Sequence, residues 1–313
     1  MASYIVKRVL RSFITLFLVV TIVFCLLRFM PVEGYFNNFD KMTPEQIERQ
    51  LDARGLNDPL PTQLVRFYND LVHMDLGESI KYRPGVPITE ILAQRIPMSM
   101  LLGTISLVLA LALGIPFGRL MTRYKGRIPD HIGTAFVVLI QAVPAVVYYL
   151  FIQMYGTSLA GLPLLFSRTN LATYVLPIIS LAIGNIAYYA MWVRRYMIDE
   201  SNKDYVKLAI AKGVNSRTLM SKQIFRNAFV PLVQYIPTSL ILTLVGSIYV
   251  ESIYSIPGMG GLLVKAIQMQ DNTLVQALVL IYSFLSIIGL IIGDIAMTLV
   301  DPRISFGKKG GAR

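Results

Sequence analysis

Few residues in this 313-residue chain could do chemistry, and their types exclude the common catalytic and metal centres. There are two histidines, His73 and His131, and one cysteine, Cys25. These residues cannot assemble a standard zinc site, so we expect no bound metal. A single thiol also excludes an internal disulfide. The sequence has no Gly-x4-Gly-Lys-Ser/Thr run, so we expect no nucleotide-binding P-loop in this chain.

The composition points to a membrane. Hydrophobic residues make up 55% of the chain, charged residues 15%, and the mean hydropathy is +0.59, whereas soluble domains carry about 25% charged residues. The net charge of +11 is compatible with nucleic acid or a membrane surface as partner. The apolar excess favours the lipid bilayer, and we expect no nucleic-acid partner.

Six stretches are apolar and long enough to cross about 30 Å of hydrocarbon. In residue numbers they are 9–30, 96–118, 132–155, 169–193, 227–250 and 272–293. The first resembles a signal peptide, because basic residues precede it, but no small-x-small cleavage site follows, and we interpret it as an anchor. The sequence therefore predicts an all-α integral membrane protein with six transmembrane helices.

Prolines and glycines within these spans predict irregular packing. Pro116, Pro144, Pro177 and Pro237 would each kink a membrane helix. The Gly114-x3-Gly118 pair would let two helices approach closely.

The loops between the spans alternate in charge. The N-terminus, the second and fourth loops and the C-terminus carry 19 cations and five anions, whereas the remaining loops carry ten cations and twelve anions. Positively charged loops stay in the cytoplasm, so both termini are predicted to be cytoplasmic.

These boundaries divide the chain into four parts. They are an N-terminal helix (1–30), an external segment (31–97), a core of five spans (98–301) with a large cytoplasmic loop (194–228), and a basic tail (302–313).

The external segment is predicted to contain two helices. Thr43 precedes the first as a cap, with Gln46 three residues on as in a capping box. The second, at 61–73, is amphipathic. This second helix could lie on the outer membrane face, dock a soluble partner or pack over the bundle.

The cytoplasmic loop is predicted to form a helix–turn–helix. One helix covers 204–213 and ends at Gly213, and the second covers 216–227. The loop is too small for a catalytic domain, but it is long enough to protrude from the bilayer.

Short motifs follow one another along most of the chain. In the cytoplasmic loop the run 204–213 precedes Arg226-Asn227-Ala228-x2-Pro231. The others are Tyr4-Ile5-x2-Arg8, Gly55-Leu56-Asn57-Asp58-Pro59-Leu60-Pro61-x-Gln63, Asp75-Leu76-Gly77-x-Ser79, Arg95-Ile96-Pro97, Tyr188-Tyr189-Ala190-x3-Arg194, Glu251-Ser252-Ile253-Tyr254-Ser255-Ile256-Pro257-Gly258-Met259-Gly260 and Asp301-Pro302-Arg303-Ile304. Together they resemble the B-type permease subunit of oligopeptide, dipeptide and nickel ABC importers.

This resemblance implies a type I importer permease fold and one half of a translocation pore in a bacterial plasma membrane. A second, similar permease would complete the pore, and an external substrate-binding protein would deliver the cargo. Two cytoplasmic P-loop ATPases would hold the ATP and Mg, so this chain would be non-catalytic and bind no cofactor. Oligopeptides are the first expected cargo, then dipeptides, then nickel or other metal chelates.

The resemblance also assigns roles to particular positions. The positions expected to couple the chain to an ATPase are Asp204, Tyr205, Ala209, Ala211, Lys212, Gly213, Arg217, Arg226 and Asn227. The positions expected to form an external gate or to contact the binding protein are Glu251, Pro257, Gly258 and Gly260.

The sequence departs from the family pattern at several places. Pro31-Val32-Glu33-Gly34 stands where the family usually has Pro-Gly-Asp-Pro, Lys207 where it has glutamate, and Ile210 where it has a basic residue. The asparagine–leucine pair usual before Asp294 is also absent. These differences predict an altered external mouth and an altered contact with the ATPase.

Two other classes of protein compete with this interpretation, namely an ion-coupled secondary transporter and a membrane scaffold that transports nothing. A secondary transporter usually has several buried charges and an internal repeat. This sequence has a single ionisable residue within a span, Asp294, which we expect to pair with Arg303 or with a neighbouring helix.

Overall fold

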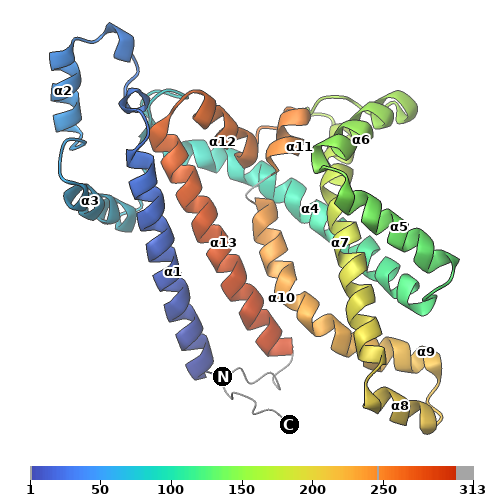
Figure 1. Ribbon diagram of the computed structural model, residues 1–313. Helices are drawn as coiled ribbons and strands as arrows, with labels where there is room; N and C mark the ends of the chain where they lie inside the picture. The colour runs from blue at the N-terminus through green and yellow to red at the C-terminus, as the bar shows by residue number, and fades with distance from the viewer. Residues whose placement is uncertain (1, 245–246, 301–313) are drawn as a thin grey trace.

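The computed structural model describes residues 2–244 and 247–300, which are mostly helical (Figure 1). The α-helices are α1 Ala2–Arg28, α2 Pro44–Ala53, α3 Leu60–Val72, α4 Ile88–Arg123, α5 Ile128–Ala142, α6 Ala145–Ala160, α7 Val175–Ser201, α8 Asp204–Ala211, α9 Ser216–Thr218, α10 Phe225–Leu244, α11 Ile248–Ile253, α12 Met259–Gln268 and α13 Asn272–Val300. Short 3-10 turns η1 Val32–Tyr35, η2 Phe39–Lys41 and η3 Leu171–Tyr174 connect them, and η4 Leu219–Ile224 is a π-helix. The strands β1 Glu78–Ser79 and β2 Val86–Pro87 pair antiparallel. The predicted tail lies outside the described residues.

Five stretches of helix in this part of the chain are long and apolar enough to cross a membrane. They correspond to α1, α4, α7, the run from α9 through α11, and α13. The remaining predicted span, the third along the chain at 132–155, is a bent pair, because α5 and α6 meet at an angle of 108° around Pro144. Proline has no amide hydrogen and clashes with the preceding turn, so this kink became a complete break.

Two boundaries differ from the sequence prediction. The second loop helix does not end at residue 227, because α9, η4 and α10 continue as one helical run into the fifth span. Pro177 lies in the first turn of α7, where a missing amide hydrogen costs little, rather than inside the helix.

Small residues bring α4 and α7 together, as the glycine pair predicted. A Cβ at Gly114 would lie 2.9 Å from the carbonyl oxygen of Ile186, and one at Gly118 would lie 2.5 Å from that of Ala190. The backbones of the two helices therefore touch, which in a membrane replaces the hydrophobic effect as a source of helix association.

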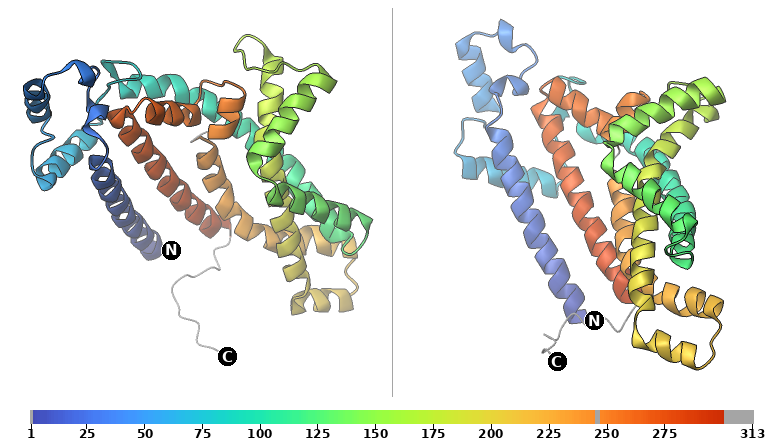
Figure 2. Two further views of the ribbon diagram at one scale, coloured as in Figure 1. Left: turned by 45° about the horizontal axis from the view of Figure 1, so that its top comes forward. Right: turned by 45° about the vertical axis from the view of Figure 1, so that its right-hand side comes forward.

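The ends of the bundle are distinct in all views (Figures 1 and 2). The start of α1, the end of α13 and the protruding α8–α9 hairpin lie at one end, and α2, α11 and α12 lie at the other. This arrangement agrees with the charge pattern, which assigns the first end to the cytoplasm.

The external segment folds onto α1 and α13. The capping box at Thr43 is present, with the Gln46 amide donating to the Thr43 hydroxyl and the Gln46 side chain accepting from the Thr43 amide. Helix α3 packs on α1, with Tyr68 stacked on Phe17 at 5.1 Å between ring centroids. Helix α3 therefore packs over the bundle with one face, while Val65 and Val72 on it remain exposed. Contact with the outer membrane face or with a soluble partner stays a prediction.

A buried carboxylate fastens the external segment to the start of α13. One oxygen of Asp271, Oδ2, accepts hydrogen bonds from the Ser79 hydroxyl at 2.6 Å and from the amides of residues 80, 81 and 82 at 3.0 Å each. Asp271 is fully buried. Four donors therefore converge on one oxygen, which explains why the Asp75–Ser79 motif ends in serine.

Replacing Asp271 with leucine should release this part of the external segment. The substitution leaves several buried donors without an acceptor, at a cost of about 3–5 kcal/mol by analogy with broken buried charge networks. We expect trypsin to cut at Lys81 and Arg83 much faster in the purified variant. Asp40→Leu, at an exposed position of the same segment, is the control; equal cleavage rates in both variants would contradict this role.

Candidate functional site

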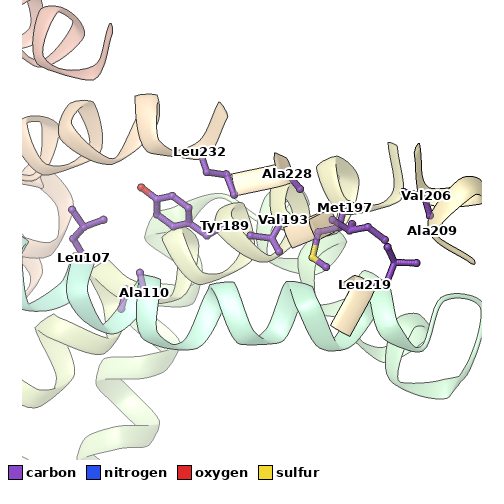
Figure 3. Packing of buried hydrophobic residues seen from close by; sticks show 12 residues of the cluster. Leu107, Ala110, Tyr189, Val193, Met197, Val206, Ala209, Leu219, Ala228 and Leu232 are labelled. Atoms are coloured by element: carbon purple, nitrogen blue, oxygen red, sulfur yellow. The ribbon is translucent and has the colours of Figure 1, made fainter. Parts of the chain in front are cut away.

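The protruding hairpin carries the predicted coupling residues, and its first helix has two different faces. The inner face of α8 is held by Val206 and Ala209, which are buried against Met197 of α7 and against Leu219 and Ile224 of η4 (Figure 3). Helix α8 is therefore part of the main core that it shares with α7 and α10.

The exposed surface of α8 carries two large apolar side chains on opposite flanks, because residues two positions apart on a helix point in different directions. Leu208 and Ile210 are 56% and 62% exposed, and Lys207, Ala211 and Lys212 are exposed beside them. Lys207 pairs with Asp204 at 2.8 Å, and both side chains are open to solvent, so this ion pair contributes little stability. Two large apolar side chains on a cytoplasmic protrusion are typical of a protein-docking surface.

The chain reverses after α8 at Gly213. Its φ is +77°, in the left-handed region, and the Val214 amide donates to the Ala209 carbonyl at 3.0 Å to close the helix end. A Cβ at Gly213 would meet no atom within 4 Å. Backbone conformation rather than crowding therefore requires glycine here.

Gly213→Val should weaken transport while leaving the protein in the membrane. Valine in the left-handed region costs roughly 1–2 kcal/mol, which is enough to shift the end of α8. We expect substrate uptake to fall about three- to tenfold. Gly126→Val is a matched control, since Gly126 has φ +73° and equally open surroundings in another loop. Equal losses in both variants would show that the effect is not specific to α8.

A polar network at the base of the hairpin joins three helices. The Asn227 side-chain amide donates to Glu200 Oε1 at 3.1 Å and to the Tyr205 hydroxyl at 3.2 Å. Lys203 pairs with Glu200 Oε2 at 2.6 Å. Burial raises the pKa of Tyr205, so its hydroxyl stays protonated and can donate to the Glu200 carboxylate while it accepts from Asn227. Asn227 thus links the end of α7, the start of α8 and the start of α10.

The predicted coupling positions fall into three groups in the structure. Ala211 and Lys212 lie on the exposed outer face with Asp204, whereas Ala209 faces the core. Tyr205 and Asn227 belong to the network, together with Glu200, which the sequence reasoning missed. Arg217 and Arg226 are exposed on α9 and α10, and the Arg217 amide is capped by Asn215 at 2.8 Å.

The predicted external site is a closed turn around a buried carboxylate. Glu251 is 4% exposed; it accepts hydrogen bonds from the Ser99 hydroxyl and the Gly261 amide, both at 2.8 Å. A Cβ at Gly258 would collide with the Glu251 carboxyl group, and one at Gly260 would lie 2.7 Å from the amide nitrogen of Ile248. Pro257 lies between α11 and α12, beside this carboxylate.

Two further charged residues singled out in the sequence, Asp294 and Arg194, have partners on neighbouring helices. Asp294 of α13 accepts a hydrogen bond from the Gln234 amide of α10 at 2.8 Å, in agreement with the predicted pairing with a neighbouring helix; Arg303 lies outside the described residues. Arg194 of α7 binds Asp130 of α5 through two bonds of 2.5 and 2.9 Å. The motif that ends in Arg194 therefore fixes the cytoplasmic end of the bent pair.

The arrangement of spans defines the class of this protein. It is similar to the MetNI methionine ABC transporter in an inward-facing conformation, with a TM-score of 0.52 at 16% identity over 68% of this chain and 97% of that chain. At this identity the likeness concerns the fold, and it confirms the predicted type I importer permease fold.

The sequence comparisons give the family. Residues 114–306 match the binding-protein-dependent transport system inner membrane component family, and residues 1–102 match its N-terminal domain family. The chain belongs to this family, so the resemblance drawn from the motifs is confirmed. The predicted location in a bacterial plasma membrane is confirmed as well.

Two curated relatives are similar to this chain over different shares of their own length. AmiC of Streptococcus pneumoniae, an oligopeptide transport system permease protein, is 37% identical over 216 residues, which cover 68% of this chain and 43% of AmiC. The chain thus matches less than half of AmiC. DppB of Lactococcus lactis, a dipeptide transport system permease protein, is 33% identical over 309 residues, which cover 97% of this chain and 99% of DppB.

Proposed function

We propose that this chain forms half of the translocation pore of an ATP-driven peptide importer and couples to a cytoplasmic ATPase through α8. The observation that carries the proposal is the two-faced α8, with its inner face fixed in the core and with Leu208 and Ile210 exposed to the cytoplasm on its other sides. Family membership and the names of both relatives support peptides as the cargo.

In this proposal the chain is not itself catalytic. A second, homologous permease completes the pore, and two P-loop ATPases bind the ATP and Mg. An external binding protein delivers the peptide, and the turn around Glu251 forms part of the outer gate or of the contact with that protein. Oligopeptides remain the first choice of cargo over dipeptides, with metal chelates after both.

The Asn227 network gives the coupling a physical route. When the ATPases close, a force on the outer face of α8 passes through its buried inner face and through Asn227 to α7 and α10. Both helices lead into the membrane, so a rigid displacement of α8 rotates the spans between inward-open and outward-open arrangements.

Gentle purification of the tagged chain from its host, followed by mass spectrometry, tests the assembly. We expect a second permease of this family and P-loop ATPases to accompany it. Purification of this chain alone, or as a homo-oligomer even after crosslinking, would favour the secondary-transporter or scaffold interpretation. Uptake of labelled di-, tri- and pentapeptides into vesicles holding the complex would then rank the cargo.

A further inference from the structure

A polar cavity lies at the outer end of α1, where the external segment covers α1 and α13. Its volume is about 250 Å³. The charged part of its wall consists of Arg28, Arg54, Arg66, Asp70 and Asp75, and the neutral polar part of Tyr35, Gln63, Thr273 and Gln276. Arg28 donates a hydrogen bond to the Tyr35 hydroxyl at 3.1 Å. Neither the coupling through α8 nor the turn around Glu251 uses any of these residues.

The Gly55–Gln63 motif builds one wall of this cavity. Gly55 has φ +65°, and a side chain there would collide with the guanidinium group of Arg66. That group pairs with Asp58 at 2.9 Å. The Gln63 amide nitrogen donates to the Leu56 and Asp58 carbonyls at 2.9 and 2.7 Å, which fixes the orientation of its side chain.

Two buried polar atoms of the lining residues have no hydrogen-bond partner within the described part of the chain. They are Arg28 Nε, a donor, and Gln63 Oε1, an acceptor. Gln63 is 8% exposed. Both atoms are closed to the cavity as well as to solvent, so a ligand would be held by the other polar atoms of the lining side chains.

The charges around the cavity have both signs. Arg66 is neutralised by Asp58, but no ion pair to Arg28 or Arg54 is found among residues 2–244 and 247–300. Asp70 and Asp75 line the same cavity, and Asp75 uses one oxygen to accept from the Gly77 amide at 2.8 Å. A ligand with one anionic and one cationic group fits this wall better than a simple anion does.

The depth of the cavity identifies a lipid as the source of such a ligand. Helix α3 contacts α1 at Phe17, Thr21 and Phe24, which lie within the membrane span. Around the same level α1 exposes Ile22 and Leu26, and α3 exposes Val65. The cavity therefore opens where hydrocarbon meets head groups. The rest of its wall is apolar and contains Phe67, Leu76, Ala277 and Leu280.

We propose that this cavity binds the head group of a phosphatidylethanolamine lipid, with the phosphate at Arg28 and Arg54 and the ammonium group at Asp70 and Asp75. The acyl chains leave along the apolar wall toward α13. The bound lipid joins the external segment to the outer surface of the bilayer.

Lipid retention by the intact transporter tests this site. The complex is reconstituted in nanodiscs with equal amounts of phosphatidylethanolamine, phosphatidylcholine and phosphatidylglycerol, then washed in mild detergent and examined by native mass spectrometry. Phosphatidylcholine has the same phosphate, but its quaternary ammonium group has no N–H donor. We therefore expect phosphatidylethanolamine to be retained about tenfold over phosphatidylcholine. The double variant Asp70→Asn/Asp75→Asn keeps the acceptor oxygens but removes both charges, and it should lose this preference.

The control is Asp40→Asn/Glu45→Gln, which neutralises two exposed carboxylates of the same segment away from the cavity. It should retain the preference. Retention of the three lipids in equal amounts, or an unchanged preference in Asp70→Asn/Asp75→Asn, would overturn the proposal. Displacement of the lipid by soluble glycerophosphoethanolamine at comparable concentration would assign the cavity to a soluble zwitterion and would overturn the lipid assignment.

Discussion

Substituting aspartate for both Leu208 and Ile210 should separate this chain from its ATPase. Both side chains are exposed on the outer face of α8, and burying each in a partner groove stabilises a complex by roughly 1.5–3 kcal/mol. Aspartate loses this contribution and adds the cost of desolvating a charge. We expect the amount of co-purified P-loop ATPase to fall at least about tenfold and peptide uptake to fall with it.

The fold itself should survive this change, because Val206 and Ala209 on the inner face of α8 are untouched. The control places the same two substitutions at Leu164 and Leu165, which are exposed in the loop between α6 and η3. That loop lies at the other end of the bundle, so the control should retain its ATPase. Normal ATPase recovery with Leu208→Asp/Ile210→Asp would show that α8 is not the docking element.

Gly118→Ala should destabilise the membrane core, because the added methyl group has no room between α4 and α7. The new Cβ would lie 2.5 Å from the Ala190 carbonyl oxygen and 2.8 Å from the Val193 Cβ, and neither α7 atom can move without the helix. Overpacking of this kind costs about 1–3 kcal/mol. We expect a lower melting temperature in detergent and less monodisperse protein in size-exclusion chromatography.

Gly184→Ala is the matched comparison within α7. Its Cβ would meet only the Tyr148 hydroxyl, at 3.0 Å, and that is the far end of a side chain that can rotate away. We expect little change in melting temperature for this variant. Alanine favours a helix more than glycine does. Equal destabilisation by both substitutions would therefore contradict the view that close contact between α4 and α7 sets the cost of Gly118→Ala.

Features encoded by neighbouring residues were predictable from the sequence. The Thr43–Gln46 capping box, the end of α8 at Gly213 and the close approach at Gly114 and Gly118 all follow from local geometry, because each depends on residues within a few positions of one another. Span lengths and loop charges are local in the same sense.

Features that depend on distant residues were not predictable. Ser79 and Asp271 are 192 residues apart, and Glu200 and Asn227 lie on different helices. No periodicity or spacing pairs such residues without knowledge of how the helices are arranged. The extent of the break at Pro144 was missed for a related reason, since neighbouring helices decide whether a proline kinks a helix or ends it.

The departures from the family pattern acquire a physical meaning from the structure. Ile210 stands where a basic residue is usual, and its side chain is exposed on the opposite flank of α8 from Leu208. Lys207 stands in place of glutamate, and its ammonium group pairs with Asp204. The proposed ATPase contact therefore has an apolar side chain where a charge is usual, which predicts an apolar partner for Ile210 in the cognate ATPase.

Site-specific crosslinking from position 210 tests the central claim most directly. The variant Cys25→Ala/Ile210→Cys would be treated in native membranes with a short thiol-to-amine crosslinker, and the products identified by mass spectrometry, with Cys25→Ala/Ala209→Cys as the buried control. The proposed function predicts a crosslink to a P-loop ATPase from position 210 and a much weaker one from position 209. Absence of any ATPase product from position 210, in membranes that contain the assembled complex, would contradict it.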